Sequence, residues 1–270
     1  MKELFRLEKA CYSYSAEYMA VADMDLTLQP GRFYAIVGPN GSGKSTLLDM
    51  LLGYKEPDSG EVLFRGRSLS SWRRRDLARE MALVPQEFTI SFPFTVAETI
   101  LMGRYPHMPR FSPASSEDWD KVQHVMQQTG IWPYRSRYIT ELSGGEKQRA
   151  VIARALVQET RILLLDEATS NLDIRHGLEL LSLIRARQQS REGTVVAVFH
   201  DLNQAVRFCD DILFLKDGRL VRMGPVGEAM NEQTLREVFE VRAKIYFEPF
   251  LDCPQAVFAC REPYSAGETA

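Results

Sequence analysis

The chain has 270 residues, of which 45% are hydrophobic, and its formal net charge is -3 at pH 7. This length and composition are sufficient for a sizeable core in one large domain or two small ones. The charge excludes the strong basic field that nucleic-acid binding usually needs, so no nucleic-acid partner is expected. The sequence contains neither a long apolar run for a membrane span nor the apolar core of a signal peptide, so a cytoplasmic chain is expected.

Alternating and continuous apolar segments predict two kinds of strand. The N-terminal segment Leu4 to Tyr14 alternates, which favours an antiparallel piece beside the main sheet. Three continuous apolar runs are each followed by glycine or polar residues and a helical pattern; they are Arg32 to Val37, Arg161 to Leu165 and Thr194 to Phe199. These runs predict a mostly parallel sheet with crossover helices, and therefore an α/β core.

The first of these strands leads into a glycine-rich loop. The sequence GPNGSGKS, Gly38 to Ser45, fits G-x-x-x-x-G-K-[ST] and is followed by a helical run. Glycines allow the backbone N–H groups to wrap a phosphate, Lys44 can reach the β and γ phosphates, and the Ser45 hydroxyl can hold Mg²⁺. A capped glycine turn formed by chance is the alternative, but the strand and helix on either side favour a phosphate loop.

Between Gln86 and Thr160 strand-like runs give way to helical periodicity, which predicts an inserted helical subdomain at about residues 87–160. Aromatic residues crowd the start of this region, at Phe88, Phe92 and Phe94. They predict either a docking loop for a partner helix or the closure of the subdomain core, and the sequence alone does not separate these two interpretations.

A second possible anion site occurs at LSGGEKQR in this subdomain. Ser143 and Glu146 form a capping box that starts a helix, which accounts for half of the pattern. Gly144 and Gly145 are poor helix formers placed where backbone N–H groups and the positive end of the helix dipole are exposed. Such an end attracts phosphate but has no lysine, so it is interpreted as half of a site.

Polar side chains follow the later apolar runs. Asp166 and Glu167 close the run Arg161 to Leu165, and the phosphate loop upstream favours a metal role for Asp166 over simple capping of the next turn. Glu167 would then polarise the attacking water. His200 and Gln86 also follow apolar runs, where each could act at the site or serve only as a packing or surface residue.

The C-terminal third ends with a predicted hairpin and a weakly patterned tail. Asp211 to Gly224 alternates around Asp217-Gly218, which favours a tight turn between two strands. From about Val241 no strong pattern is present, and residues 261–270 are expected to be frayed.

The motifs Gly38 to Thr46, Gln86, LSGGEKQR, LLLDEATSNLD and His200, in this order and spacing, resemble the nucleotide-binding subunit of ATP-binding-cassette (ABC) transporters. The resemblance implies an α/β fold with a P-loop NTPase (RecA-like) core, a flanking antiparallel β subdomain and an inserted α-helical subdomain. It also implies that residues 1–240 form an ABC ATP-binding domain and that 241–270 form a partly disordered C-terminal extension.

The resemblance further assigns a role to each matching residue, with ATP and Mg²⁺ as cofactors. Tyr14 would stack on adenine, although it could be an ordinary strand tyrosine with Tyr12 and Tyr18 close by. Glu167 would be the general base, His200 would contact the γ-phosphate, and Gln86 would sense the metal and the membrane partner. ATP would bind at Tyr14, Gly38, Pro39, Asn40, Gly41, Ser42, Gly43, Lys44, Ser45 and Thr46, and Mg²⁺ at Ser45, Gln86 and Asp166. The ATP of a second copy would be contacted by Ser143, Gly144, Gly145 and Asp173.

Longer phrases resemble one branch of the family, which imports iron–siderophore complexes, haem and cobalamin. They are Phe92 to His107, Leu172 to Leu181 and His200 to Gly224. This branch implies a homodimer on the cytoplasmic face of the inner membrane, integral-membrane permease subunits and, indirectly, a solute-binding protein. The alternatives are the ATPase of an exporter, an importer of another substrate such as molybdate or zinc, and a soluble ABC ATPase of DNA repair or translation.

Overall fold

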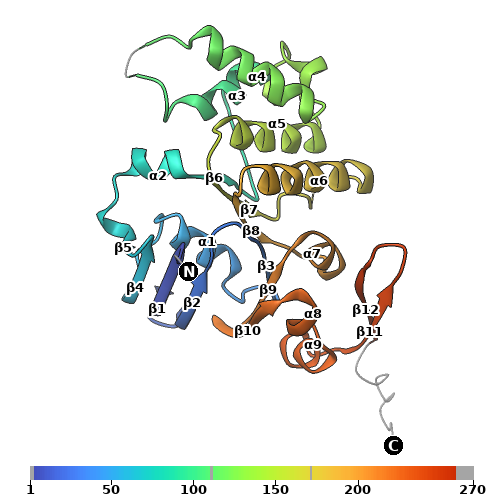
Figure 1. Ribbon diagram of the computed structural model, residues 1–270. Coiled ribbons are helices and arrows are strands. Elements are labelled where there is room, and N and C mark those ends of the chain that lie inside the picture. Colours follow the sequence, from blue (N-terminus) through green and yellow to red (C-terminus); the bar gives the residue numbers. More distant parts are fainter. Residues whose placement is uncertain (1–2, 110–111, 171, 260–270) are drawn as a thin grey trace, which may run out of the picture.

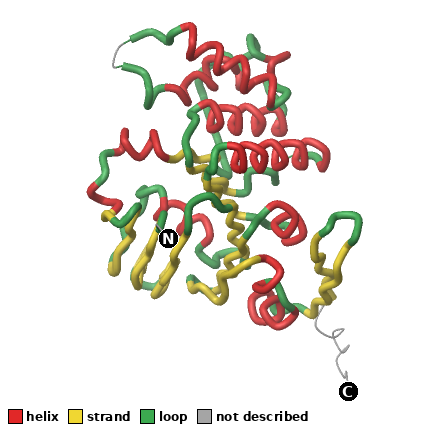
Figure 2. Tube along the Cα trace, viewed as in Figure 1, coloured by secondary structure: helices red, strands yellow, loops and turns green. Residues whose placement is uncertain are grey.

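The computed structural model of the protein describes residues 3–109, 112–170 and 172–259. Within these residues the strands form three sheets, and helices surround the largest sheet (Figure 1). Figure 2 shows that most of the helices lie in one half of the molecule, opposite a separate antiparallel sheet. The predicted α/β fold with a flanking antiparallel β subdomain and an inserted helical subdomain is therefore confirmed.

The largest sheet is mostly parallel and runs in the order β10-β9-β3-β8-β7-β6. Its strands are β3 (Phe33–Val37), β6 (Met81–Val84), β7 (Ile162–Asp166), β8 (Thr194–Val198), β9 (Asp211–Lys216) and β10 (Arg219–Pro225). Every residue of β3 and β8 is buried. Strands covered by other elements on both faces must be apolar throughout, which is why these segments are continuous apolar runs in the sequence. The carboxyl ends of β3, β7 and β8 consequently meet at one edge of the sheet.

The flanking sheet is antiparallel and has the order β2-β1-β4-β5. Its strands are β1 (Phe5–Ser15), β2 (Tyr18–Leu28), β4 (Ser59–Phe64) and β5 (Arg67–Ser68). Phe5, Leu7 and Met24 are buried, while Arg6 and Glu8 point to solvent and form an ion pair at 2.7 Å. This alternation is the period-two pattern of a sheet with one face on the core.

The hairpin predicted at Asp217-Gly218 connects β9 and β10. Both turn residues have positive φ, 50° and 75°, as a two-residue turn between twisted strands requires. Gly218 also passes close to the flanking sheet, because its carbonyl accepts a hydrogen bond from the Ala22 N–H at 2.9 Å. The turn therefore joins the two sheets.

The inserted helical subdomain has no strand among its described residues between β6 and β7. Its main helices are α3 (Val96–Leu101), α4 (Ser116–Gln128) and α5 (Gly144–Val157), with short 3₁₀ helices at η2 (Met102–Arg104), η3 (Trp132–Tyr134) and η4 (Ile139–Glu141). Capping boxes begin all three α-helices, at Thr95, Ser115 and Ser143. Each box satisfies backbone N–H groups that the first helical turn leaves free.

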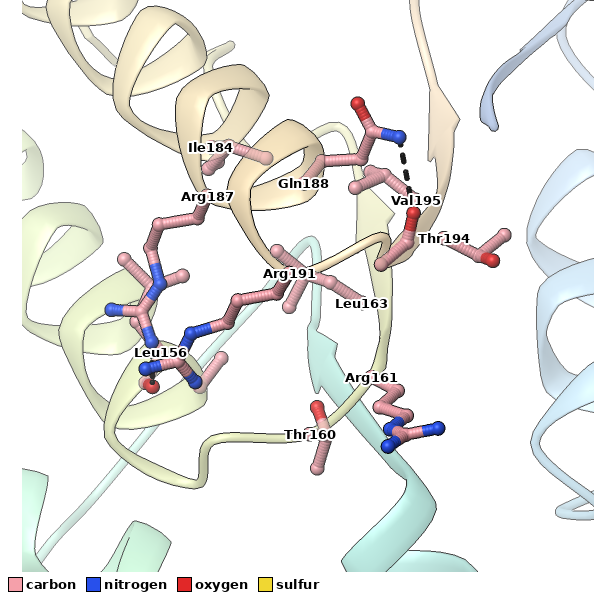
Figure 3. Close-up of a pocket in the computed structure, with 12 residues that line it drawn as sticks. Leu156, Thr160, Arg161, Leu163, Ile184, Arg187, Gln188, Arg191, Thr194 and Val195 are labelled. Carbon is pink, nitrogen blue, oxygen red and sulfur yellow. Dashed lines mark hydrogen bonds between the residues drawn. The ribbon is translucent and has the colours of Figure 1, made fainter. Parts of the chain in front are cut away.

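The remaining helices cover the sheets or follow them. They are α1 (Lys44–Leu51), α2 (Arg74–Glu80), α6 (Ile174–Ser190), α7 (Leu202–Phe208), α8 (Val226–Ala229) and α9 (Glu232–Phe239), with a 3₁₀ turn at η1 (Leu69–Ser71). Arg187 near the end of α6 donates to the carbonyl of Leu156 in the last turn of α5 at 3.0 Å, and Figure 3 shows its side chain reaching across to that helix. A cation at a helix C-terminus is favourable, so Arg187 fastens the helical subdomain to the core. No helix among the described residues has both the length and the apolar character needed to cross a membrane.

A second hairpin, β11 (Arg242–Glu248) and β12 (Cys253–Ala259), forms where the sequence showed no strong pattern. It stands beside α7, and Asn203 clamps it by accepting from the Ala256 N–H at 2.8 Å and donating to the Ala256 carbonyl at 3.2 Å. No strong pattern in the sequence indicated this hairpin, because a tertiary contact with α7 holds it in place. The predicted fraying of residues 261–270 lies outside the described residues.

Candidate functional site

The glycine-rich loop, residues 38–43, connects β3 to α1 through backbone positions that exclude side chains. A Cβ on Gly38 would lie 2.2 Å from the Leu215 carbonyl oxygen, and one on Gly43 would lie 2.3 Å from the Ala20 oxygen. Gly43 also has φ of 93°, which is strained for other residues. The loop therefore needs these glycines to lie between β9 and the flanking sheet, where its N–H groups can surround a phosphate.

Ser42 in this loop and Lys44 at the start of α1 carry buried polar atoms that suit an anionic ligand. The Lys44 ammonium donates to the carbonyls of Gly38 and Pro39, at 2.9 and 2.8 Å. Burial lowers the pKa of Lys44, and the carboxylates of Glu167 and Asp166 oppose this shift. The Ser42 hydroxyl is buried with no hydrogen-bond partner. A buried hydroxyl without a partner is costly, and a bound phosphate would satisfy it.

Ser45 and Asp166 come together although 121 positions separate them in sequence. The Ser45 hydroxyl, in the first turn of α1, donates to the Asp166 carboxylate at the end of β7 at 3.1 Å. The two oxygens are of the kind that Mg²⁺ prefers. The described residues contain no group of three or more His, Cys, Asp or Glu that could hold a metal. Phosphate oxygens and water could complete the coordination of an ion held at Ser45 and Asp166.

Glu167 is held between two predicted site residues. The Gln86 side-chain amide donates to one carboxylate oxygen at 2.7 Å, and His200 Nε2 lies 2.6 Å from the other. The three residues follow β6, β7 and β8, so neighbouring strand ends bring them together. Glu167 has φ of 51°, an uncommon conformation outside glycine. A carboxylate fixed in this way can orient a water molecule and accept its proton.

Tyr14 lies near the phosphate loop at the end of β1. Its hydroxyl is 3.2 Å from that of Thr46 in α1, and its ring stacks on Tyr18 at 5.9 Å. Lys55, which the sequence analysis did not single out, lies over the Tyr14 ring at 4.7 Å. Tyr14 is 54% exposed, so part of the residue stays accessible although Tyr18 and Lys55 contact its ring.

Within one chain the two candidate anion sites, the phosphate loop and the N-terminus of α5, do not come together. Ser143 and Gly144 are exposed, and a Cβ added to Gly144 would meet nothing within 4 Å. Helix α5 packs on α3, α4 and β6, whereas α1 packs on β2, β7 and β8 (Figure 1). The N-terminus of α5, with Gly145 in its first turn, is thus open to a second molecule.

Two further contacts link the predicted residues to their surroundings. The Gln148 side chain in α5 donates to the Ala168 carbonyl at 2.8 Å, directly after Glu167. Asp173 caps α6 by accepting from the His176 N–H at 2.9 Å, and His176 Nδ1 lies 2.7 Å from the same carboxylate. The sequence analysis gave Gln148 and His176 no role. The sequence signals for them were that Gln148 lies inside LSGGEKQR and that His176 lies three residues after Asp173.

Asp166→Asn is expected to stabilise the nucleotide-free protein. Burial raises the pKa of Asp166, and Glu167 and Asp49 raise it further, while the Ser45 hydrogen bond and Lys44 oppose the rise. The folded protein therefore binds this proton more tightly than the unfolded chain, and the ionised carboxylate lowers stability as pH rises through the raised pKa. At pH 7.5 the amide should therefore raise the Tm.

Calorimetry without nucleotide measures this shift, with Asp120→Asn on exposed α4 surface as the matched control. The control should leave Tm unchanged. A lower Tm for Asp166→Asn would show that the carboxylate is stabilising in the folded state, against the direction expected here.

A phosphate loop after a parallel strand, a carboxylate beside the serine that follows this loop and a second carboxylate directly after the first define a P-loop nucleoside triphosphatase. The family model described as ABC transporter matches residues 21–170. The chain belongs to the ABC transporter family and is one of its ATP-hydrolysing cassettes.

Named relatives support this membership over most of the chain. The ferric enterobactin transport ATP-binding protein FepC of Escherichia coli is 37% identical over 89% of each chain. The hemin import ATP-binding protein HmuV of Bordetella bronchiseptica is 38% identical, with coverage of 86% of this chain and 90% of the relative. The cobalamin import protein BtuD of Halobacterium salinarum is 38% identical over 84% of this chain, which spans only 56% of that relative's length.

Solved structures show the same fold. A metal-chelate type ABC transporter in an inward-facing conformation has a TM-score of 0.81 and 28% identity, with coverage of 96% of this chain and 98% of that one. A bacterial ABC transporter cassette solved as a dimer has a TM-score of 0.75 and 28% identity, over 83% of this chain and 99% of the other. The expected family and fold are thus confirmed.

Proposed function

We propose that this chain is the ATP-hydrolysing subunit of a membrane importer, and that it powers uptake of a metal chelate of the iron–siderophore, haem or cobalamin type through separate permease subunits. The names of the relatives and the metal-chelate type of the similar structure support this substrate class. The position of Glu167 between Gln86 and His200, beside the phosphate loop, carries the proposal, because it is the arrangement that hydrolysis of a bound triphosphate needs.

Each residue of the first site has a proposed task. Gly38, Pro39, Asn40, Gly41, Ser42 and Gly43 wrap the phosphates, Lys44 and Thr46 contact them, and Tyr14 stacks on the base. Ser45, Gln86 and Asp166 hold Mg²⁺, which when bound neutralises charge that develops on the phosphates. Glu167 accepts the proton of the attacking water, and His200 contacts the γ-phosphate while holding Glu167 in place.

The second site is proposed to act on the nucleotide of another copy. Two chains would pack head to tail, so that Ser143, Gly144 and Gly145 of one copy contact the ATP on the phosphate loop of the other, with Asp173 bridging the two. The exposed N-terminus of α5 supports this arrangement, since its free N–H groups and helix dipole attract phosphate. Dimeric cassettes among similar structures also support it.

The permease is proposed to bind on the helical side of the protein, at the cytoplasmic face of the membrane. Phe92 and Phe94 are 70% and 39% exposed, whereas Phe88 packs against the core. The exposure of Phe92 and Phe94 favours a docking loop for a partner helix, whereas the packing of Phe88 fits closure of the subdomain core.

In this proposal residues 1–240 form the ATP-binding domain, with the helical subdomain at about 87–160, and residues 241–270 form a C-terminal extension. A solute-binding protein delivers the chelate to the permease.

Uptake of radiolabelled metal chelates tests the proposed function. Cells that lack this subunit are expected to lose uptake of one member of a panel of ferric siderophores, haem and cobalamin. Reintroduction of the wild-type chain should restore it, and the Lys44→Ala chain should not. Unchanged uptake of every compound would reject the metal-chelate importer.

A further inference from the structure

The ammonium group of Lys55 lies over two tyrosine rings of β1. It is 4.7 Å from the centre of the Tyr14 ring and 5.2 Å from the centre of the Tyr12 ring. The two rings meet edge to face, with their centres 5.3 Å apart, so one cation contacts a pair of packed aromatic side chains. The negative face of a tyrosine ring attracts a lysine, and the attraction is strongest where water is partly excluded.

Contacts on either side of Lys55 hold it in this place. Its N–H donates to the Asp49 carbonyl at 3.3 Å, and its ammonium lies 3.7 Å from the Asp49 carboxylate. Three residues later, Asp58 attaches the chain to β1, because its carboxylate accepts from the Ser13 N–H at 2.7 Å. The Lys55 side chain is also partly buried. Its position beside the tyrosine rings is therefore well determined.

The other contacts of Tyr14 leave the direction of its ring poorly determined. The pairing of β1 with β2 shifts in register on both sides of Ser13, so the ladder is irregular where Tyr14 lies. Such irregularities re-aim side chains and are frequent beside active sites. The contact of the Tyr14 hydroxyl with Thr46, at 3.2 Å, restrains only the tip of the ring. Lys55 adds a restraint on the aromatic face itself.

Tyr18 is the second neighbour of the Tyr14 ring and is held more weakly than Lys55. The two ring centres are 5.9 Å apart, with 22° between the planes. The Tyr18 hydroxyl is 3.4 Å from the Gly41 carbonyl oxygen, which is long for an O–H···O hydrogen bond, and the residue is 47% exposed. A base that reaches Tyr14 can therefore displace Tyr18 at a lower cost than Lys55.

We propose that Lys55 is a positioning residue for the base of ATP: it holds the Tyr14 ring, and the base replaces Tyr18 as the partner of that ring. The inference rests on the proposed function, since it takes Tyr14 as the residue that stacks on adenine. A cation over the ring draws π-electron density toward itself, which makes the ring a better partner for an electron-rich purine. A ring that is already ordered also loses less conformational freedom when the base binds.

Binding of ATP and of inorganic triphosphate to the full chain tests the role of Lys55. Lys55→Met removes the charge and should weaken ATP binding about five-fold, as expected for a cation–π contact near the surface, without changing the binding of inorganic triphosphate. Lys55→Arg keeps a cation and should retain ATP binding within about two-fold. Arg67→Met is the matched control, because Arg67 lies 5.3 Å from the Trp72 ring centre in the flanking sheet and should affect neither ligand. Equal weakening of both ligands by Lys55→Met would overturn the inference.

A double-mutant cycle with Tyr14→Ala separates this role from a general effect on structure. In the Tyr14→Ala background, Lys55→Met should cause no further loss of ATP binding, because the ring through which Lys55 acts is absent. A further loss of the same size would give Lys55 a role independent of Tyr14 and contradict the inference. Tyr18→Ala should bind ATP at least as tightly as the wild type. Weaker binding would make Tyr18 part of the base site, against the displacement described above.

Tyr14→Ala by itself distinguishes failure of the proposed function from failure of this inference. If it weakened only ATP binding while Lys55→Met changed neither ligand, Tyr14 would still stack on the base and only the role of Lys55 would fail. If it left ATP binding unchanged, the proposed task of Tyr14 would fail, and that of Lys55 with it. In hydrolysis, Lys55→Met should raise KM for ATP and keep kcat within about two-fold, whereas a lower kcat at unchanged KM would overturn the inference.

Discussion

Replacement of Glu167 by glutamine should reduce ATP hydrolysis by a factor of about 10² to 10⁴, the usual contribution of a general base. The amide keeps the size of the side chain but cannot accept a proton from water. Binding of ATP should persist, because the phosphate loop and Lys44 are unchanged, and ATP-bound dimers should accumulate. Phosphate release measures the first effect, and size-exclusion chromatography with ATP measures the second.

A glutamate outside the site provides the control for this variant. Glu179 on α6 is exposed and pairs with Arg175 at 2.8 Å, so Glu179→Gln should leave hydrolysis unchanged. Gln86→Ala and His200→Ala, which remove the contacts that hold Glu167, should each slow hydrolysis as well. Near-normal turnover by Glu167→Gln would exclude Glu167 as the base.

Ser143→Arg is expected to abolish hydrolysis while sparing nucleotide binding by the isolated subunit. Ser143 lies at the exposed start of α5, remote from the phosphate loop of its own chain. A long cation there would block the approach of a second copy and remove a donor for its phosphates. We expect a loss of hydrolysis of about 10²-fold or more, similar to the loss of other preorganised donors to developing charge.

The capping box of α4 supplies a matched control. Ser115 caps its helix in the same way as Ser143, with Asp118 in place of Glu146. Ser115→Arg should remove an equivalent helix cap, which lowers stability by about 1 kcal/mol, and should leave hydrolysis intact. Equal loss of activity in both variants would trace the effect to helix stability. Failure of Ser143→Arg to bind ATP as a monomer would contradict the split site.

Local patterns in the sequence predicted many of the elements and the motifs of the candidate site, but not the hairpin of β11 and β12. The continuous apolar runs predicted β3, β7 and β8, because strands buried on both faces have no polar positions. The phosphate loop, the Ser143 capping box and the Asp217-Gly218 turn were also readable, since each is specified by residues a few positions apart. The ABC family followed from the order of these motifs.

The tertiary structure alone decided which distant groups meet. The contact of Ser45 with Asp166, the grip of Gln86 and His200 on Glu167, and the clamp of Asn203 on β12 join residues from separate elements, and no local period encodes them. The separation of the two anion sites is of the same kind. It depends on how α5 packs against α3 and α4 and away from α1, which only the folded chain determines.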